Sequence, residues 1–107
     1  MEREFFITQI RIAGNTAAPC FVAIKQKGYV VEAYVDKISD DEYLWTWDAI
    51  KDKRRFSATS PEELLGLISM WEVRGDEWNI SDNEYRDYES IKENAVVYDG
   101  VNVLEDE

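Results

Sequence analysis

The sequence of 107 residues contains no histidine and only one cysteine, Cys20. Without an imidazole, there is no histidine base, no Ser-His or Cys-His nucleophilic pair and no Cys/His zinc site. One cysteine cannot form an internal disulfide, so the folded state needs no oxidising compartment. Because Cys20 lies in an apolar stretch and has no histidine to activate it, we expect a buried, unreactive thiol.

The chain also lacks glycine-rich phosphate loops and long apolar runs. Neither the dinucleotide-binding fingerprint nor the P-loop pattern occurs, and no apolar run approaches the roughly 20 residues that cross a bilayer. The first four residues, Met1-Glu2-Arg3-Glu4, do not have the basic-then-apolar layout of a secretory signal. We therefore expect a cytoplasmic protein that holds no cofactor or metal and does not bind membranes.

Positive charge is scarce in one part of the chain only. Residues 1–60 carry nine basic and nine acidic side chains, whereas residues 61–107 carry three basic and fourteen acidic ones. The net charge of −11 therefore lies in the second segment, and such a one-sided field attracts positively charged partners and repels nucleic acid. Composition alone favours the simpler interpretation that the carboxylates only keep a small domain in solution. The uneven distribution of the charge raises the expectation of a basic protein partner.

Short apolar runs with a two-residue period indicate strands, and polar turns separate them. The runs lie at residues 4–12, 20–25, 29–35, 43–48 and 54–58, and Asp99-Gly100 between two β-rich runs predicts a further hairpin. With 45% hydrophobic residues, the chain can form a core, and its length fits a single domain over residues 1–107 with a frayed end. The predicted fold is α+β, with an antiparallel sheet of four or five strands.

The clearest local signal is a helix start at Ser60-Pro61-Glu62-Glu63. Serine caps the first turn, proline has no N–H to leave unpaired there, and the glutamates complement the helix dipole. With Gly75 as the stop signal, the helix is predicted over residues 61–74 and packs on one face of the sheet. The apolar stripe is Leu64, Leu67, Ile68 and Trp71, and its expected partners are Val31, Ala33, Val35 and Phe56. Residues 82–93 are compatible with a second, acidic helix.

Three aromatic side chains, Tyr43, Trp45 and Trp47, share one face of the strand predicted over residues 43–48. They form either part of the core or an exposed platform. We expect Trp45 to be in the core, and Tyr43 and Trp47, at the strand ends, to be exposed to a partner.

One basic cluster, Lys51, Lys53, Arg54 and Arg55, follows these aromatics. Cations beside tryptophans can stack nucleic-acid bases, but the overall negative charge opposes this. The alternative is that the cluster pairs with the acidic segment of the same protein, and such self-pairing would also suit a weak homodimer.

The nearest thing to a family signature is the run from Ser60 to Leu67, continued by residues 71–75. The chain as a whole is a small domain without recognisable catalytic residues, and its acidic residues lie beside aromatic ones. This whole-chain profile resembles that of small acidic immunity proteins, with which bacteria neutralise toxins. The resemblance implies an inhibitor that covers the active site of a toxin or a nearby surface.

The sequence thus predicts a non-enzymatic protein that sequesters a basic protein partner as a monomer or weak homodimer. One alternative is a small enzyme or ligand-binding domain, which requires a concave site with a carboxyl group of raised pKa. The other is a structural dimerisation module. The candidate partner-binding residues are Tyr43, Trp47, Glu72, Asp76, Glu77, Asp82, Glu84 and Asp87.

Overall fold

The computed structural model describes residues 6–100 and 102–104, and the chain divides into two compact units between Asp76 and Glu77. The fold is α+β with an antiparallel sheet. The expectation of a single domain over residues 1–107 stays a prediction. The first unit contains α1 (Ala17–Gln26), β1 (Val30–Lys37), β2 (Tyr43–Lys51), β3 (Arg54–Ala58) and α2 (Pro61–Arg74), and the second contains α3 (Asp82–Glu93), β4 (Val97–Asp99) and β5 (Asn102–Leu104).

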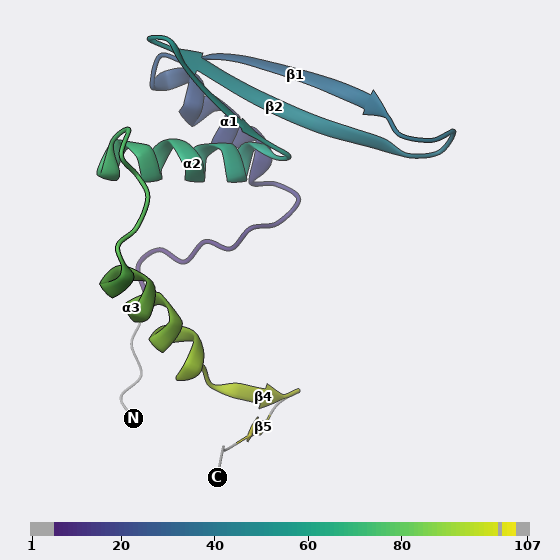
Figure 1. Cartoon of the computed structure of the whole chain (residues 1–107). Helices are drawn as coiled ribbons and strands as arrows, with labels where there is room; N and C mark the ends of the chain where they lie inside the picture. The colour runs from purple at the N-terminus through teal and green to yellow at the C-terminus, as the bar shows by residue number, and fades with distance from the viewer. Residues whose placement is uncertain (1–5, 101, 105–107) are drawn as a thin grey trace. The chain divides into compact units, whose positions relative to one another are not determined.

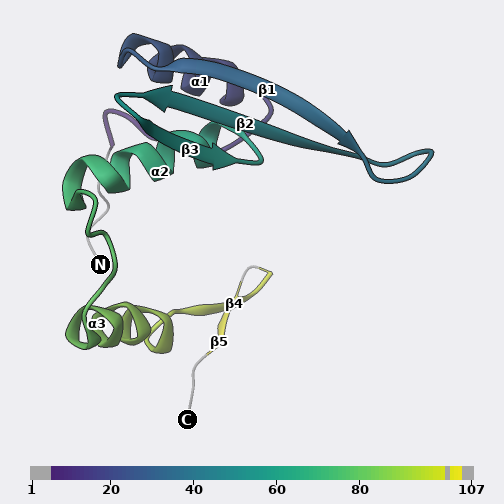
Figure 2. The ribbon, with the colours of Figure 1, turned by 45° about the horizontal axis from the view of Figure 1, so that its top comes forward.

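The sheet of the first unit has the strand order β1-β2-β3. Strand β2 pairs with β1 along its length, whereas the short β3 pairs only with the part of β2 from Trp47 to Lys51. The turn between β2 and β3 consists of Asp52 and Lys53, which both have the positive φ that a two-residue hairpin favours. Beyond β3, the pair β1/β2 continues as a two-stranded hairpin that extends past both helices (Figures 1 and 2).

Both α1 and α2 pack on the same face of this sheet, and the core lies between the two helices and the sheet (Figure 2). Its buried hydrophobic residues are Ile24, Tyr29, Ala49, Leu64 and Ile68. Helix α2 has the bounds that the sequence predicted, because the Ser60 hydroxyl accepts a hydrogen bond from the Glu63 N–H and Gly75 ends the helix with a φ of 81°.

The expected contacts between helix and sheet are correct only in part. Leu64 and Ile68 are fully buried, but Leu67 is 36% exposed, and Leu65 packs against the core instead. Val35, predicted to lie under the helix, is 40% exposed; it pairs with Trp45, beyond the part of β2 that β3 covers.

The strand predicted over residues 20–25 is wrong, because this segment forms α1. A short apolar run fits a helix as well as a strand, and here Ile24 is buried against α2 and the sheet. Pro19 does not prevent the helix, since N–H groups of the first turn have no partner within a helix. Cys20 consequently lies on a helix and is only half-buried.

The strand predicted over residues 4–12 is also wrong where it can be compared. Residues 6–12 form no strand, and Phe6, Ile7, Ile10 and Ile12 are exposed; residues 4 and 5 lie outside the described part. This segment has the apolar, β-branched side chains that are typical of a strand. A strand also needs a neighbouring strand for its backbone hydrogen bonds, however, and this segment pairs with none in the described sheets. The described sheets consequently have three and two strands, not the four or five predicted for one sheet.

The second unit confirms a helix near residues 82–93 and a hairpin around Asp99-Gly100. Helix α3 begins with a capping box, in which the Glu84 carboxylate accepts from the Ser81 N–H at 2.8 Å and the Ser81 hydroxyl accepts from the Glu84 N–H. Gly100 has the positive φ of the turn between β4 and β5. Among the helices described, none is long and apolar enough to cross a membrane.

Candidate protein-binding site

The projecting hairpin, residues 32–46, is here called the arm. Neither helix covers it, and its apolar side chains are correspondingly open to solvent. Trp45 is 51% and Tyr43 57% exposed. The other large apolar side chains of the arm, which lie on both of its faces, are exposed as well: Tyr34, Val35, Ile38 and Leu44. Large exposed apolar patches on a protein surface mark sites of interaction with other molecules.

The arm is also strongly acidic. It carries five acidic residues and a single basic one, Lys37; the acids are Glu32, Asp36, Asp40, Asp41 and Glu42. The basic residues that balance them in the first 60 positions include the cluster around the β2–β3 turn, at the opposite end of β2. Sequence analysis missed this separation because it counted charge along the chain, whereas counting charge for each predicted hairpin would have revealed it.

The structure reverses the expectation for two of the three aromatics. Trp45, expected in the core, is exposed to about half of its surface. Trp47, expected at the surface, is the more buried of the two, and its ring packs edge-on against that of Phe21 with centroids 6.2 Å apart. The reason is that burial increases along β2 from the tip of the arm at Tyr43 toward Ala49. Tyr43 lies near the free tip of the arm, and cover from β3 and the helices begins at Trp47.

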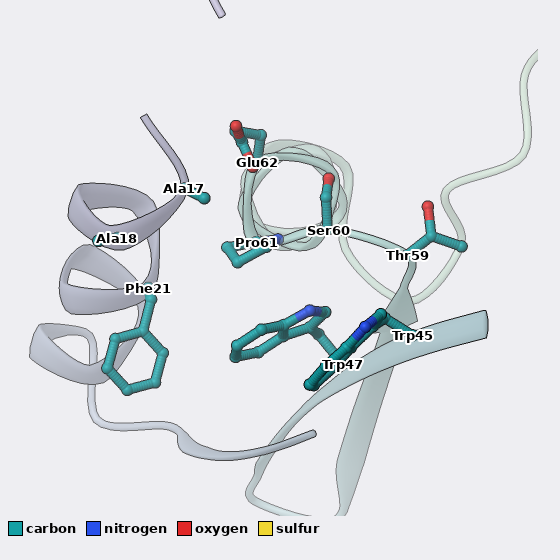
Figure 3. A pocket seen from close by; sticks show the side chains of 9 residues that line it. All are labelled: Ala17, Ala18, Phe21, Trp45, Trp47, Thr59, Ser60, Pro61 and Glu62. Atoms are coloured by element: carbon teal, nitrogen blue, oxygen red, sulfur yellow. The ribbon is translucent and has the colours of Figure 1, made fainter. Parts of the chain in front are cut away.

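A groove of about 560 Å³ opens where the arm joins the body of the first unit (Figure 3). Its floor is formed by Trp45 and Trp47, whose rings are nearly parallel with centroids 6.3 Å apart. The first turn of α1 and Phe21 form one wall, and residues 59–62 at the start of α2 form the other. Glu62 ties the walls together, because its carboxylate accepts a hydrogen bond of 2.8 Å from the Thr16 hydroxyl.

Two of the predicted partner-binding acids, Glu72 and Asp76, are engaged within the protein. Glu72 pairs with Lys27 at 2.9 Å, and Asp76 receives two hydrogen bonds from Arg54, at 2.8 and 2.6 Å, and a third from the Trp71 indole at 2.7 Å. This confirms for Arg54 the alternative that the basic cluster pairs with the acidic segment of the same chain.

The bond network around Asp76 predicts a specific pH dependence. Hydrogen bonds from Arg54 and Trp71 hold the pKa of the Asp76 carboxyl well below its usual range. The ionised carboxylate therefore stabilises the fold above the unfolded-state pKa of about 4, and this stabilisation is lost as the pH falls further toward the folded-state value. We expect Asp76→Asn to lower the melting temperature at neutral pH and to narrow its difference from the wild type below about pH 4.

Thermal unfolding followed by circular dichroism across this pH range measures the difference. The exposed Asp87→Asn in α3 serves as the control for loss of one negative charge. If the melting temperature of Asp76→Asn differs from that of the wild type by the same amount at every pH, the role assigned to the Arg54–Asp76 pair is contradicted.

The other four predicted acids lie in the second unit. Glu77 precedes α3, and Asp82, Glu84 and Asp87 belong to it. All four are exposed, and Glu84 has the structural role in the capping box. Of the predicted set, Tyr43 and Trp47 lie on β2 of the first unit, while these four acids belong to the second compact unit.

The alternative of a carboxylate-lined site concerns the pKa values of the carboxyl groups. That alternative requires a carboxyl of raised pKa, whereas hydrogen bonds from Thr59 and Ser60 lower the pKa of Glu63, as those from Arg54 and Trp71 lower that of Asp76. A second cavity, of about 90 Å³, holds Asp52 and Glu72 together with lysine and arginine side chains. Over the described residues, no group of three or more potential ligands is placed to hold a metal ion.

Comparison with known proteins yields no relative. No family model matches the chain, and no curated protein or solved structure matches it. The arguments for function therefore rest on the arm and the groove themselves.

Proposed function

We propose that this protein is a non-enzymatic binding protein that sequesters a basic protein partner, in the form of an immunity-type inhibitor of a toxin. One observation carries the proposal: the arm presents exposed aromatic side chains among five acids and one base, and neither helix covers it. The same combination is typical of surfaces that bind proteins, where aromatic anchors supply affinity and charge supplies orientation.

The chemistry of the arm defines the partner. Tyr43 and Trp45 can bury a large area at the cost of few rotatable bonds, which is how interface anchors act. The acids beside them require lysine or arginine across the interface, because like charges placed opposite each other cost several kcal/mol. A two-stranded projection also fits into a concave surface, such as the active site of an enzyme that binds an anionic substrate.

The second unit has a different part in this proposal. Residues 77–107 carry ten acidic and two basic side chains, so this unit contributes most of the net charge. Exposed charge acts over about a Debye length and changes mainly the rate of encounter. We assign Glu77, Asp82, Glu84 and Asp87 to attracting the partner, and the arm to holding it.

Two triple variants with the same change in charge separate these roles. The arm variant combines Asp40→Asn, Asp41→Asn and Glu42→Gln, and its matched control combines Glu77→Gln, Asp82→Asn and Asp87→Asn. The full-length wild type is used to capture partners from an extract of the source cell at low and high salt. The captured protein is then purified, and its binding kinetics are measured with each variant.

We expect the arm variant to dissociate about tenfold faster than the wild type, since contacts at the interface govern dissociation. The control should mainly associate more slowly and depend less on salt. If the captured protein is a toxin, its activity should fall to zero on adding one equivalent of the wild type. An arm variant that dissociates at the wild-type rate, or a captured partner that is acidic, would refute the proposal.

A further inference from the structure

The groove is lined almost entirely by apolar surface, and its few polar side chains come from residues 59–62. In Figure 3 the rings of Trp45, Trp47 and Phe21 lie on one side, and the side-chain oxygen atoms of Ser60 and Glu62 lie on the other. Of the described residues that line the groove, none is basic. The groove thus offers indole faces and a carboxylate without a cation of its own.

The first unit already contains this combination in occupied form. The Arg54 guanidinium lies 4.7 Å from the ring centroid of Trp71, while Asp76 accepts two of its hydrogen bonds. An indole and a carboxylate therefore hold an arginine side chain at the end of α2. Trp45 on β2 and Glu62 in the first turn of α2 both line the groove, so an indole and a carboxylate are present there as well.

We propose that the groove binds an arginine side chain presented by a basic segment of the partner; this inference rests on the proposed function. The aliphatic stem lies against Phe21 and Trp47, the guanidinium stacks on the exposed ring of Trp45, and the carboxylate of Glu62 neutralises its charge. An aliphatic side chain would fill the interior but leave the Glu62 carboxylate unused. Lysine fits less well, because its ammonium group is more strongly hydrated and does not stack as a plane.

The charges around the groove support a cationic occupant. Glu62 lines the groove, Glu63 follows it on α2, and Trp45 on the floor belongs to the acidic arm. The hydrogen bond from Thr16 holds the Glu62 carboxylate in place without neutralising its charge. A cation entering the groove thus meets a carboxylate whose position is already fixed, which lowers the entropy lost on binding.

A residue-resolved titration tests the inference without the natural partner. The full-length protein is titrated with a capped tri-arginine peptide while the indole N–H signals of its four tryptophans are followed by nuclear magnetic resonance. Capped tri-lysine and N-acetyl-leucine amide are the comparison probes. The variants are Trp45→Leu, which keeps an apolar floor without a ring, and Glu62→Gln, with the exposed Glu93→Gln in α3 as the control for general charge.

We expect tri-arginine to shift the signals of Trp45 and Trp47 and to leave those of Trp71 and Trp78 in place. Trp45→Leu and Glu62→Gln should each weaken binding about fivefold, and Glu93→Gln less than about twofold. Binding of the leucine probe in place of tri-arginine, equal binding of tri-lysine, or equal effects of Glu62→Gln and Glu93→Gln would each overturn the inference.

The outcome is separable from that of the proposed function. If tri-arginine does not reach the groove but the arm variant still releases a basic partner faster, the groove inference fails and the proposed function stands. If tri-arginine binds as expected but no basic partner depends on the arm, the groove is an arginine site and the proposed function fails.

Discussion

Replacing Leu64 with alanine is expected to lower the free energy of unfolding by about 3 kcal/mol. Leu64 is fully buried in α2, where it belongs to the core cluster with Ile24 and Ala49. Its truncation removes apolar contacts and leaves a cavity that two helices and a sheet cannot close without distorting one another. Urea unfolding followed by tryptophan fluorescence measures the loss.

The same helix provides a matched control for this substitution. Leu67 lies three residues further along and is 36% exposed, so Leu67→Ala is expected to cost less than about 1 kcal/mol. Both positions belong to the apolar stripe that the sequence predicts for this helix, and only the structure distinguishes them. Equal losses at the two positions would contradict the described orientation of α2 on the sheet.

Shortening the arm is expected to abolish partner binding and to leave the body of the first unit stable. Residues 37–43 would be replaced by Asn-Gly, so that the new turn joins Asp36 to Leu44, which are paired in the sheet. The Ile38 N–H donates to the Glu42 carbonyl at 2.9 Å, and such pairs recur every second residue of an antiparallel ladder. The Asp36–Leu44 pair is therefore of the kind that a two-residue turn closes.

This change removes Tyr43 and three of the five arm acids but no residue of the core. We therefore expect the free energy of unfolding to stay within about 1 kcal/mol of the wild type. Binding to the purified partner, measured by calorimetry, should fall below detection because both the aromatic anchor and its neighbouring charges are lost. A shortened protein that binds with the wild-type affinity would place the contact surface elsewhere.

The two failed strand predictions share a physical cause. Residues 6–12 and 20–25 are apolar and rich in β-branched or aromatic side chains, which suits a strand but does not supply one with neighbours. The first segment is not paired in the described sheet, and the second is a helix because Ile24 reaches the core from α1. Local preference was overridden in both segments by the pairing and packing available in the folded chain.

The sequence predicted which aromatic residues share a face of the candidate site, but not which of them are exposed. The aromatics Tyr43, Trp45 and Trp47 were recognised as a shared face of one strand, which the structure confirms by the register of β2. Which of them would be exposed depended on how far β3 and the helices extend, and no local pattern contains that length. The groove was not predicted, because it is formed by three segments distant in the sequence.

The sequence by itself determined the elements whose signals are local. It defined α2 through Ser60 and Gly75 and the hairpin around Asp99-Gly100, because caps and turns depend on a few neighbouring residues. It also determined the net charge and the absence of histidine.

Only the tertiary structure decided where charge and aromatic surface meet. Pairing β1 with β2 gathers five acids and the half-exposed Trp45 on the arm, while Arg54 is brought to Asp76 at the other end of the sheet. Burial and electrostatic fields depend on distances through space between segments far apart in the chain. Those distances are set when the helices and strands pack together, and for that reason no local reading of residues contains them.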